Sequence, residues 1–382
     1  FRSSQYMQDT PIKTAFVSTN SITQGEQVAG VWKPLYDRFG IHIDFAHRTF
    51  RWDSEASLKA HVHCVIVGFS VAPFTEKKWL FTSERVQEAE NINAYLMDAP
   101  NVFIGSRNKP LCNVPLMTTG NRPADGGHLI IEDADYADFI KEEPSAKPYI
   151  KQLIGAAEFI NNKKRWCLWL VGVSPAELRK MPLVMKRVAA CKADRENAPD
   201  AGRRKLADCP TQFREINNPD TFIVVPAVSS ERRKYVPIGF LDKETIATNL
   251  VITIPDATLY HFGILTSNVH MAWMRAVCGR LEMRYRYSKD VVYNNFPWPT
   301  PTDEQKARIE QTAQAILDAR ELYPDCSLAD LYDEATMPPE LRKAHQQNDK
   351  AVMQAYGFWG KLNSESACVA ELMRMYQGLT EK

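Results

Sequence analysis

The stretch Tyr-Asn-Asn-Phe-Pro-Trp-Pro at residues 293–299 carries amide and aromatic side chains of the kind that hold an extruded nucleobase. Enzymes that methylate the amino group of adenine use the order Asn-Pro-Pro-aromatic, because the Asn side chain and a Pro carbonyl accept the amino hydrogens while the ring stacks on the base. Here Phe296 follows Asn295, so the Pro carbonyl is not in place. The pair Asn218-Pro219 continues into Asp220 and offers no ring. We therefore predict no catalytic residue in this chain.

The same stretch suits a junction between two domains better than a reaction centre. Pro297 and Pro299 can neither continue a helix nor donate to a central strand, so they favour a rigid connection. We expect a hinge-like seam in which Phe296 and Trp298 pack the two domains together. Contact of residues 293–294 with a nucleic acid is the second possibility.

Other kinds of reactive site find little support. A strand would place His61 and His63 on one face and Cys64 on the other, and no second ligand pair follows at zinc spacing. No Gly-x-Gly cluster follows a strand to bind a nucleotide-like cofactor, and no Ser lies in a nucleophile-elbow context. We predict neither a metal site nor a cofactor-binding site here.

Basic side chains concentrate between Glu177 and Lys205, in a pattern typical of a pair of helices. Such a cluster can fix a duplex by its phosphates without reading its sequence, although a solvated helix surface is the alternative. A second basic group lies at 275–290, where arginines alternate with Tyr285 and Tyr287. The candidates for phosphate contact are Arg187, Arg195, Arg203, Arg204, Lys205, Arg275, Arg280, Arg284 and Arg286.

The stretch Ser-Ser-Glu-Arg-Arg-Lys-Tyr at 229–235 lies between these groups, in a predicted loop after a strand. Its side chains are able to distinguish guanine, cytosine and adenine edges in a major groove. For each of them an ordinary surface position is the alternative, because base-contacting residues are a minority even in a true interface. The candidates for base recognition are Ser229, Ser230, Glu231, Arg232, Arg233 and Lys234.

Three regions must position these residues. Residues 14–70 follow the order strand, helix, strand and strand, which is the later part of a doubly wound sheet with its ligand site at one edge. Residues 71–300 carry short β-prone runs and turn-rich stretches, which favours a mixed α+β domain with long loops. From Pro299 onward the chain is helical: Thr302 and Gln305 form a capping box, and Pro338-Pro339 begins another helix that Gly357 can end.

The composition fits an ordinary protein of two or three domains. The formal net charge of +1 makes no case for a polyanionic partner, so any such surface must come from local clustering. Eight cysteines without a Cys-x-x-Cys pair favour reduced thiols in a cytoplasm. No apolar run reaches membrane-span length, so we expect no membrane partner. The chain opens on Phe1 and soon enters a strand pattern, which suggests a fragment of something longer.

Nearly the whole chain resembles the MmeI-like restriction-modification enzymes, single chains that join a nuclease, a gamma-class adenine-N6 DNA methyltransferase and a target recognition domain. The matching stretches occur in the expected order: TAFVSTNSITQGEQV (14–28), FAHRTFRWDSEASLKAHVHCVIVGFS (45–70), NRPADGG (121–127), RWCLWL (165–170), VSSERRKYVPIGF (228–240), LTSNVHMAWMRAVCGRLEMRYRYS (265–288), YNNFPWP (293–299), LYDEATMPPELRKAH (331–345) and AYGF (355–358).

The resemblance implies an α/β remnant of a Rossmann-like methyltransferase sheet at 1–75, an α+β target recognition domain at 76–300 and an α-helical C-terminal domain at 301–382. Nuclease, cofactor and Asn-Pro-Pro-aromatic motifs would lie upstream, so this chain alone would have neither activity. S-adenosylmethionine is the implied methyl donor of the full-length protein, and Mg²⁺ is implied only if an upstream nuclease exists. Double-stranded DNA and the rest of the methyltransferase domain are the implied partners.

The resemblance also adds site residues. Gamma-class enzymes are similar in placing an aromatic side chain against the flipped adenine, and that position falls on Phe50, with Trp52 as second choice. Plain core packing is the alternative for Phe50. Ser267 and Asn268 join the candidates for base recognition. The implied function is the recognition part of a site-specific adenine-N6 methyltransferase; a stand-alone specificity subunit acting in trans with a catalytic partner is the alternative.

Overall fold

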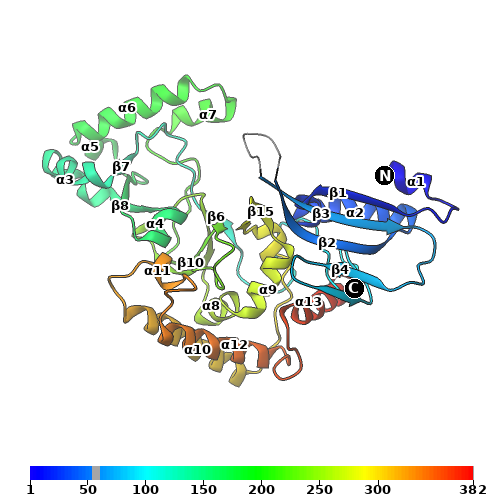
Figure 1. Cartoon of the computed structure of the whole chain (residues 1–382). Helices are drawn as coiled ribbons and strands as arrows, with labels where there is room; N and C mark the ends of the chain where they lie inside the picture. The colour runs from blue at the N-terminus through cyan, green and yellow to red at the C-terminus, as the bar shows by residue number, and fades with distance from the viewer. Residues whose placement is uncertain (54–60, 382) are drawn as a thin grey trace.

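The computed structural model describes residues 1–53 and 61–381, so residues 54–60 of the stretch at 45–70 lie outside the described residues. Figure 1 shows a strand-rich N-terminal part on the right, a mixed central part with a raised lobe on the left, and helices along the lower side. None of the described helices is both long and apolar enough to cross a bilayer.

The N-terminal part is a five-stranded sheet in the order β1-β3-β2-β4-β5. Strand β3 is antiparallel to both of its neighbours, so β1 and β2 run parallel with β3 between them, and β4 extends the sheet parallel to β2. The expected strand–helix–strand–strand order is therefore present, and the sheet continues past the expected boundary at residue 75. The strands are β1 (Thr14–Thr19), β2 (His42–Asp53), β3 (His61–Ser70), β4 (Lys78–Phe81) and β5 (Val86–Ala89).

Helix α2 (Glu26–Phe39) connects β1 to β2 and covers one face of this sheet. Its buried residues Val28, Trp32 and Leu35 follow the helical spacing of the sequence, and Trp32 packs edge-on against Phe69 of β3 at 6.2 Å between ring centroids. Gly40 ends the helix in the left-handed conformation at φ +62°, which a glycine adopts without a steric penalty. Helix α1 (Arg2–Tyr6) precedes the sheet.

The central part contains three small sheets. The first, β12-β10-β14-β6, consists of β12 (Gly239–Asp242), β10 (Thr221–Pro226), β14 (Val251–Pro255) and β6 (Thr118–Thr119). The second, β11-β16-β15, consists of β11 (Val228–Ser229), β16 (Arg284–Arg286) and β15 (Gly279–Leu281). The third, β13-β8-β9-β7, consists of β13 (Thr245–Ala247), β8 (Ile150–Ile154), β9 (Arg165–Leu168) and β7 (Ile130–Glu132). Helices α4 (Ala156–Asn161), α8 (Leu259–Leu265) and α9 (Asn268–Val277) pack beside them.

The lobe is built on the third sheet and has a hydrophobic core of its own. That core includes Leu129 and Ile131 from the sheet side and Val184, Val188 and Cys191 from the long helix. The helix pair expected between Glu177 and Lys205 is present as α6 and α7. The helices of the lobe are α3 (Asp133–Glu142), α5 (Pro175–Leu178), α6 (Pro182–Glu196) and α7 (Ala201–Lys205).

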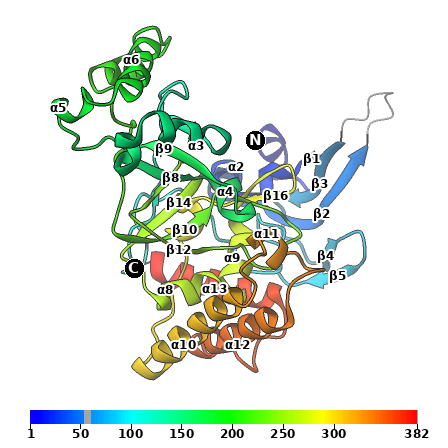
Figure 2. The same cartoon turned by 90° about the vertical axis from the view of Figure 1, so that its left-hand side faces the viewer.

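The C-terminal part is helical, as expected. Thr302 and Gln305 form the predicted capping box at the start of α10, and Pro339 is the first residue of α12. Figures 1 and 2 both show α10 and α12 side by side beneath α8. The helices are α10 (Asp303–Glu321), α11 (Leu328–Leu331), α12 (Pro339–Ala355) and α13 (Glu365–Thr380). The mixed α/β character of the chain is thus confirmed.

One large core runs through all three parts, and residues 293–299 lie inside it. Phe296 is fully buried and meets His270 edge-on at 4.5 Å between ring centroids, while Trp298 packs on Tyr293. The expected packing of Phe296 and Trp298 across a domain seam is therefore present. Tyr293 and Asn294 are 0% and 1% exposed, which corrects the possibility that they reach a nucleic acid.

Hydrogen bonds hold the stretch 293–299 within the central part, and the Tyr356 hydroxyl of the C-terminal part donates to the Pro297 carbonyl at 2.8 Å. A single π-helical turn at Lys289–Tyr293 leaves backbone carbonyls without helical partners. The Asn295 amide donates to the carbonyls of Asp290 (2.8 Å), Val291 (3.1 Å) and Gly105 (3.0 Å), and its oxygen accepts from Arg107 Nε (3.3 Å).

Buried histidines make the fold sensitive to acid. His270 is fully buried against Phe296, with Nε2 2.8 Å from the Tyr287 hydroxyl, and burial lowers the pKa of His270 to about 3. The unfolded chain takes up this proton near pH 6.5 whereas the folded chain does not, so stability is lost as the pH falls below 6.5. His270 alone should cost about 2 kcal/mol at pH 5.

We expect His270→Gln to flatten the decline in unfolding free energy between pH 7.5 and 5, measured by urea titration. The comparison with the unsubstituted protein is needed because burial raises the pKa of Asp349 to about 6. Protonation of that carboxyl therefore adds to the unfolding free energy as the pH falls, which opposes the effect of His270. Identical pH profiles for the two proteins would show that His270 is not the acid-sensitive group.

Candidate nucleic-acid interface

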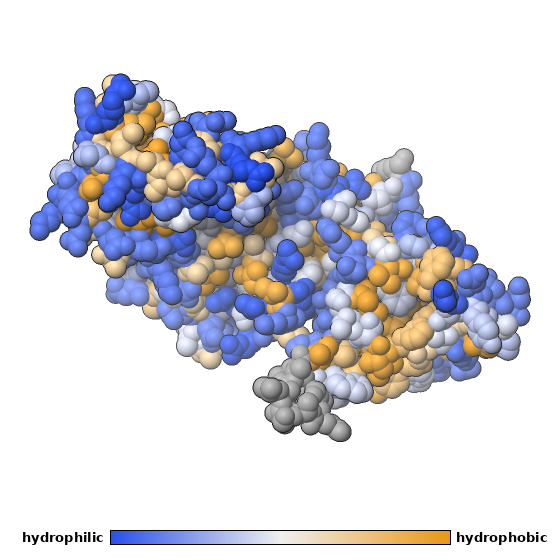
Figure 3. Space-filling model, turned by 90° about the horizontal axis from the view of Figure 1, so that it is seen from above, coloured by the Kyte–Doolittle hydropathy of each residue, from blue (hydrophilic) through white to orange (hydrophobic). Residues whose placement is uncertain are grey.

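A groove of about 780 Å³ lies where the N-terminal sheet meets the central part. It is formed at the carboxyl ends of β1 and β2, which is the edge where open α/β sheets bind their ligands. Figure 3 shows this face from above, with the N-terminal part on the right. The surface is hollowed between the N-terminal part and the lobe. The groove is lined by Thr19, Asn20, Ser21, Gln24, Arg51, Val62, His63, Ser230, Glu231, Arg232, Arg280, Glu282, Met283 and Arg284.

The small sheet β11-β16-β15 brings the two predicted recognition segments together. Val228 pairs with Arg286 and Ser229 with Tyr285, so the stretch after residue 229 leaves the sheet beside the β15–β16 hairpin. A second hollow of about 460 Å³ continues along this hairpin and includes Arg286. Segments far apart in the sequence thus form one continuous surface.

Residues 230–233 form a tight turn at the rim of the groove. The Arg233 N–H donates to the Ser230 carbonyl (3.2 Å), and the Arg232 N–H donates to the Ser230 hydroxyl (3.3 Å). Glu231 is half-buried and Arg232 is exposed, so both side chains are accessible from the groove. Burial lowers the pKa of Arg233, although Asp333 opposes that shift.

The hairpin adds positive charge to the groove. Arg280 donates to the Met283 carbonyl (3.0 Å) and stacks over the Tyr285 ring, while Arg284 pairs with Glu282 at 3.1 Å. Counting Arg51 and Arg232, four arginines face two glutamates among the residues that line the groove. This excess favours a negatively charged ligand.

A polar segment from β1 to α2 also lines the groove, and the sequence analysis gave it no role. Asn20 is only 8% exposed, and its Nδ2 finds no hydrogen-bond partner among the described residues. Gly25 adopts φ +54°, a left-handed conformation that favours glycine, and its N–H donates to the Val277 carbonyl (3.2 Å) close to the backbone of Gly279. The signal that could have identified Ser21 and Gln24 was their place directly after the first strand.

Phe50 and Trp52 lie on the opposite face of β2 from Arg51, because side chains alternate along a strand. Phe50 is half-buried and meets His47 edge-on at 4.9 Å between ring centroids, whereas Trp52 is 54% exposed. Their rings are 6.3 Å apart. They form an accessible aromatic pair next to the groove rather than part of its lining.

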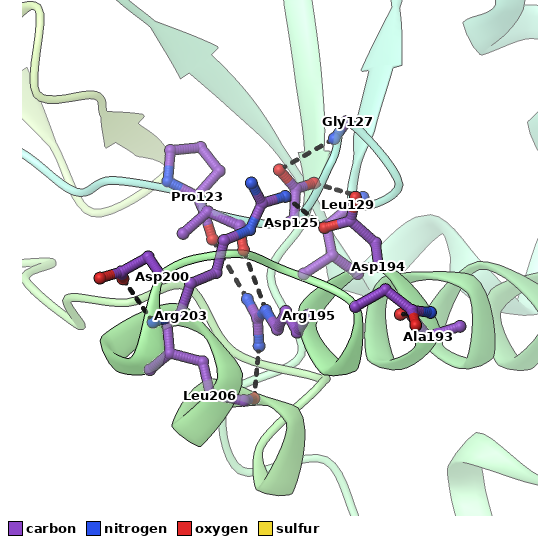
Figure 4. A network of polar contacts seen from close by, with 12 residues as sticks. Pro123, Asp125, Gly127, Leu129, Ala193, Asp194, Arg195, Asp200, Arg203 and Leu206 are labelled. Carbon is purple, nitrogen blue, oxygen red and sulfur yellow. Dashed lines mark hydrogen bonds and ion pairs between the residues drawn. The ribbon is translucent and has the colours of Figure 1, made fainter.

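Arg195 has no role on the surface, which corrects its assignment to phosphate contact. Its side chain is fully buried between α6, α7 and the loop at 123–124 (Figure 4). Nε donates to the Ala124 carbonyl (3.0 Å), Nη1 to the carbonyls of Leu206 (3.0 Å) and Cys209 (2.8 Å), and Nη2 to those of Pro123 (3.1 Å) and Gln212 (2.7 Å). All five N–H donors are used in holding the lobe together.

The other basic residues of the lobe divide into internal and exposed ones. Arg187 donates to the carbonyls of His128 and Ile130, both at 2.9 Å, and Arg203 forms an ion pair with Asp194 (Figure 4). Arg204 and Lys205 are exposed on α7. Figure 1 shows α7 at the end of the lobe that is nearer to the N-terminal part.

Ser229, Ser267 and Asn268 are turned inward, which corrects their assignment to base edges. Ser229 is 3% exposed. Ser267 is fully buried and caps α9, since its hydroxyl accepts from the His270 N–H at 3.3 Å. The Asn268 amide donates to the Met353 sulfur at 3.4 Å.

Arg275 is also committed to an internal contact, which corrects its assignment to phosphate. Nε and Nη2 each donate to Glu365 at 2.8 Å in a bidentate pair, and Nη1 donates to the Lys234 carbonyl at 2.9 Å.

No three His, Cys, Asp or Glu side chains converge as metal ligands within the described residues, which do not include the His61 side chain. Each of the eight cysteines carries a free thiol. The groove described above is a polar, arginine-rich surface beside the aromatic pair Phe50 and Trp52.

Three family models match consecutive parts of the chain: the MmeI DNA-methyltransferase domain at residues 1–82, the MmeI target recognition domain at 98–300 and the MmeI C-terminal domain at 301–382. DNA methyltransferase A of Bacillus subtilis (strain 168) is 42% identical over 379 residues, which are 99% of this chain and 43% of that protein. The solved structure of the type IIL restriction-modification enzyme MmeI in complex with DNA is 45% identical and superimposes with a TM-score of 0.92, over 100% of this chain and 52% of that chain. The chain thus spans about half of these relatives.

The buried Arg195 predicts a strong effect on the lobe. Arg195→Met would keep the aliphatic packing but leave five carbonyls without their donor, so we expect the unfolding free energy of the lobe to fall by about 3–5 kcal/mol. Hydrogen exchange of α6 and α7 would report the loss. Lys205→Met, at an exposed position, is the matched control and should change protection little. Equal protection in the two variants would contradict this role for Arg195.

Proposed function

This chain belongs to the MmeI family, and from that premise we propose that it supplies sequence recognition to a site-specific DNA adenine-N6 methyltransferase, together with one wall of the pocket for the extruded adenine. The observation that carries the proposal is the groove, in which the turn 230–233 and the β15–β16 hairpin meet the carboxyl ends of β1 and β2. A duplex in this groove would present its base edges to the turn while one base leaves the stack toward the methyltransferase strands.

Within this proposal the exposed residues have two kinds of role. Glu231, Arg232 and Arg233, with Ser230 and Lys234 beside them, read base edges, because they project from a short turn at the rim of the groove. Phosphate contacts fix the register of the duplex and come from the half-buried Arg280 and from the exposed cations of the hairpin and of α7: Arg284, Arg286, Arg204 and Lys205.

The aromatic pair Phe50 and Trp52 takes the role of stacking on the extruded adenine. A base that has left the duplex loses its neighbours and needs an aromatic face in exchange. Support for this role comes from the exposed Trp52 ring and from the half-buried Phe50 beside it at the carboxyl end of β2.

The rest of the methyltransferase domain is the proposed partner of the N-terminal sheet. Strand β1 is an open edge, with Ala15, Phe16 and Val17 all exposed. A row of unpaired backbone groups flanked by apolar side chains favours pairing with a further strand. Figure 3 shows apolar side chains gathered on this part of the surface. The relatives are longer than this chain, and we propose that their additional residues include the strand that pairs with this edge.

The described residues do not fit the methyl donor by themselves. S-adenosylmethionine requires a glycine-rich strand-to-helix turn, and β1 is instead followed by Asn-Ser-Ile-Thr-Gln-Gly. We therefore assign the cofactor to the remainder of the methyltransferase domain and derive no step through it here. Mg²⁺ would be needed only for a nuclease in the full-length protein. We propose the cytoplasm as the location of the enzyme, because its proposed substrate is cellular DNA.

We expect the intact protein, expressed in a host without other DNA methyltransferases, to produce N6-methyladenine at one fixed sequence. Single-molecule sequencing of the host genome would identify the site, and mass spectrometry of nucleosides would identify the methylated base. Methylcytosine in place of methyladenine, or methylation scattered without a shared sequence, would refute the proposal.

The two roles of the exposed residues predict different mutant behaviour. Glu231→Gln should reduce discrimination at one base pair by about 5–150-fold, corresponding to about 1–3 kcal/mol, because an amide replaces a carboxylate acceptor. Lys205→Gln should weaken all duplexes by the same factor and lower the slope of log affinity against log salt by about 1.

Fluorescence anisotropy with single-base variants of the site at several salt concentrations separates these effects. If Glu231→Gln weakened every duplex equally, the turn would not be the base-reading element.

A further inference from the structure

The recognition turn is short and is bound to the C-terminal helices at its far end. On its near side, Ser229 belongs to β11 and pairs with β16. On its far side, three residues are held by helices. The Lys234 carbonyl accepts from Arg275 of α9, and the Tyr235 hydroxyl donates to Asp349 of α12. The Ile238 carbonyl accepts from Arg320 of α10. Of the four residues 230–233 between these anchors, Ser230, Glu231 and Arg232 line the groove.

Tyr235 forms the first anchor. It is 2% exposed, and its ring stacks on His345 of α12 with 4.1 Å between ring centroids. Its hydroxyl donates to Asp349 Oδ2 at 2.6 Å, and the other oxygen of Asp349 accepts from the Asn268 N–H at 2.8 Å. Asp349 thus joins the end of the turn to the start of α9.

Arg275 forms the second anchor, between three elements. It extends from α9, donates to the Lys234 carbonyl at 2.9 Å and pairs with Glu365 at the start of α13 through two bonds of 2.8 Å. Its side chain is 18% exposed, so solvent screens this pair only in part. The carboxylate orients the guanidinium, which in turn holds the backbone of the turn.

A third contact extends the same arrangement to Ile238. Arg320 of α10 donates to the Ile238 carbonyl at 2.8 Å and to the Tyr332 hydroxyl at 2.9 Å, and that hydroxyl lies 2.8 Å from His345 Nε2. Helices from the C-terminal part therefore hold the chain at two points within a few residues of the turn.

We infer that the C-terminal helices determine how accurately the turn reads DNA, with Tyr235, Asp349, Arg275 and Glu365 as positioning residues that themselves touch no base. This inference rests on the proposed function of the turn. Base readout requires side chains held to within about 0.5 Å, whereas phosphate contacts tolerate more movement. Loosening an anchor should therefore reduce discrimination between sites more than overall affinity for duplex DNA.

Two substitutions in the intact protein test the inference. Tyr235→Phe removes the donor to Asp349 but keeps the ring, and Glu365→Gln removes the charge that orients Arg275. We expect each to reduce the ratio of methylation at the recognised site to methylation at single-base variants by at least about 10-fold, with nonspecific duplex affinity changed less than about 3-fold.

Matched controls come from the same C-terminal part of the chain. Tyr323→Phe removes a hydroxyl that donates to Glu340 at 2.7 Å, and Glu334→Gln removes the partner of Arg342 at 2.9 Å. Neither pair includes a residue that holds Lys234, Tyr235 or Ile238, so both controls should retain the discrimination ratio.

Comparison of methylation at different DNA sites distinguishes a positioning role from a general effect on stability. If Tyr235→Phe and Glu365→Gln lowered methylation at all sites by one common factor, the inference would be overturned, since a merely structural role has that effect. Should Tyr235→Phe fail to fold, the half-exposed Glu365→Gln decides alone. Absence of site-specific methylation by the unsubstituted protein would instead refute the proposed function, which keeps the two failures distinct.

Discussion

The side chain of Asn295 fixes the stretch of chain that joins the central part to the C-terminal part. Its amide donates to Asp290 and Val291 in the π-helical turn and to Gly105 in a distant loop, and its oxygen accepts from Arg107. A buried amide so fully paired gives a net stabilisation of about 1 kcal/mol per bond, and each partner left without it would cost more. The turn, the loop and the packing of Phe296 are therefore fixed together.

Arginine shows how one residue type serves different ends in this fold. Arg195 is an interior residue with five carbonyl acceptors, Arg275 is a clamp between helices, and Arg232 lies exposed at the groove. The planar guanidinium suits all three roles because it offers five donors in a fixed geometry. A cluster of arginines in the sequence is thus weak evidence for a nucleic-acid surface, because some of them donate to backbone carbonyls inside the fold.

Local signals in the sequence predicted local structure well. The run at 14–19, the helix ended by Gly40 and the capping box at Thr302 depend on neighbours within a few residues, so their pattern is readable. The groove depends on distant pairing of Ser229 with Tyr285, which no local pattern encodes. Burial of Ser229, Ser267 and Arg195 likewise follows from tertiary contacts, and their polar character alone favoured the surface. The order of residues in 293–299 was enough to predict a packed seam there.

The span of the Asn295 contact also has a consequence for synthesis on the ribosome. Asn295 and Gly105 are 190 positions apart, and the loop around Gly105 acquires its partner only when both have left the ribosome. At 5–20 residues per second this interval is roughly 10–40 s. During that time the apolar residues that later pack against residues 293–299 are not yet buried by them. The core of the lobe lies between Leu129 and Ile246, so the lobe can fold within the same interval. The nascent chain therefore passes through a stage in which the lobe is folded and the rest of the central part is not.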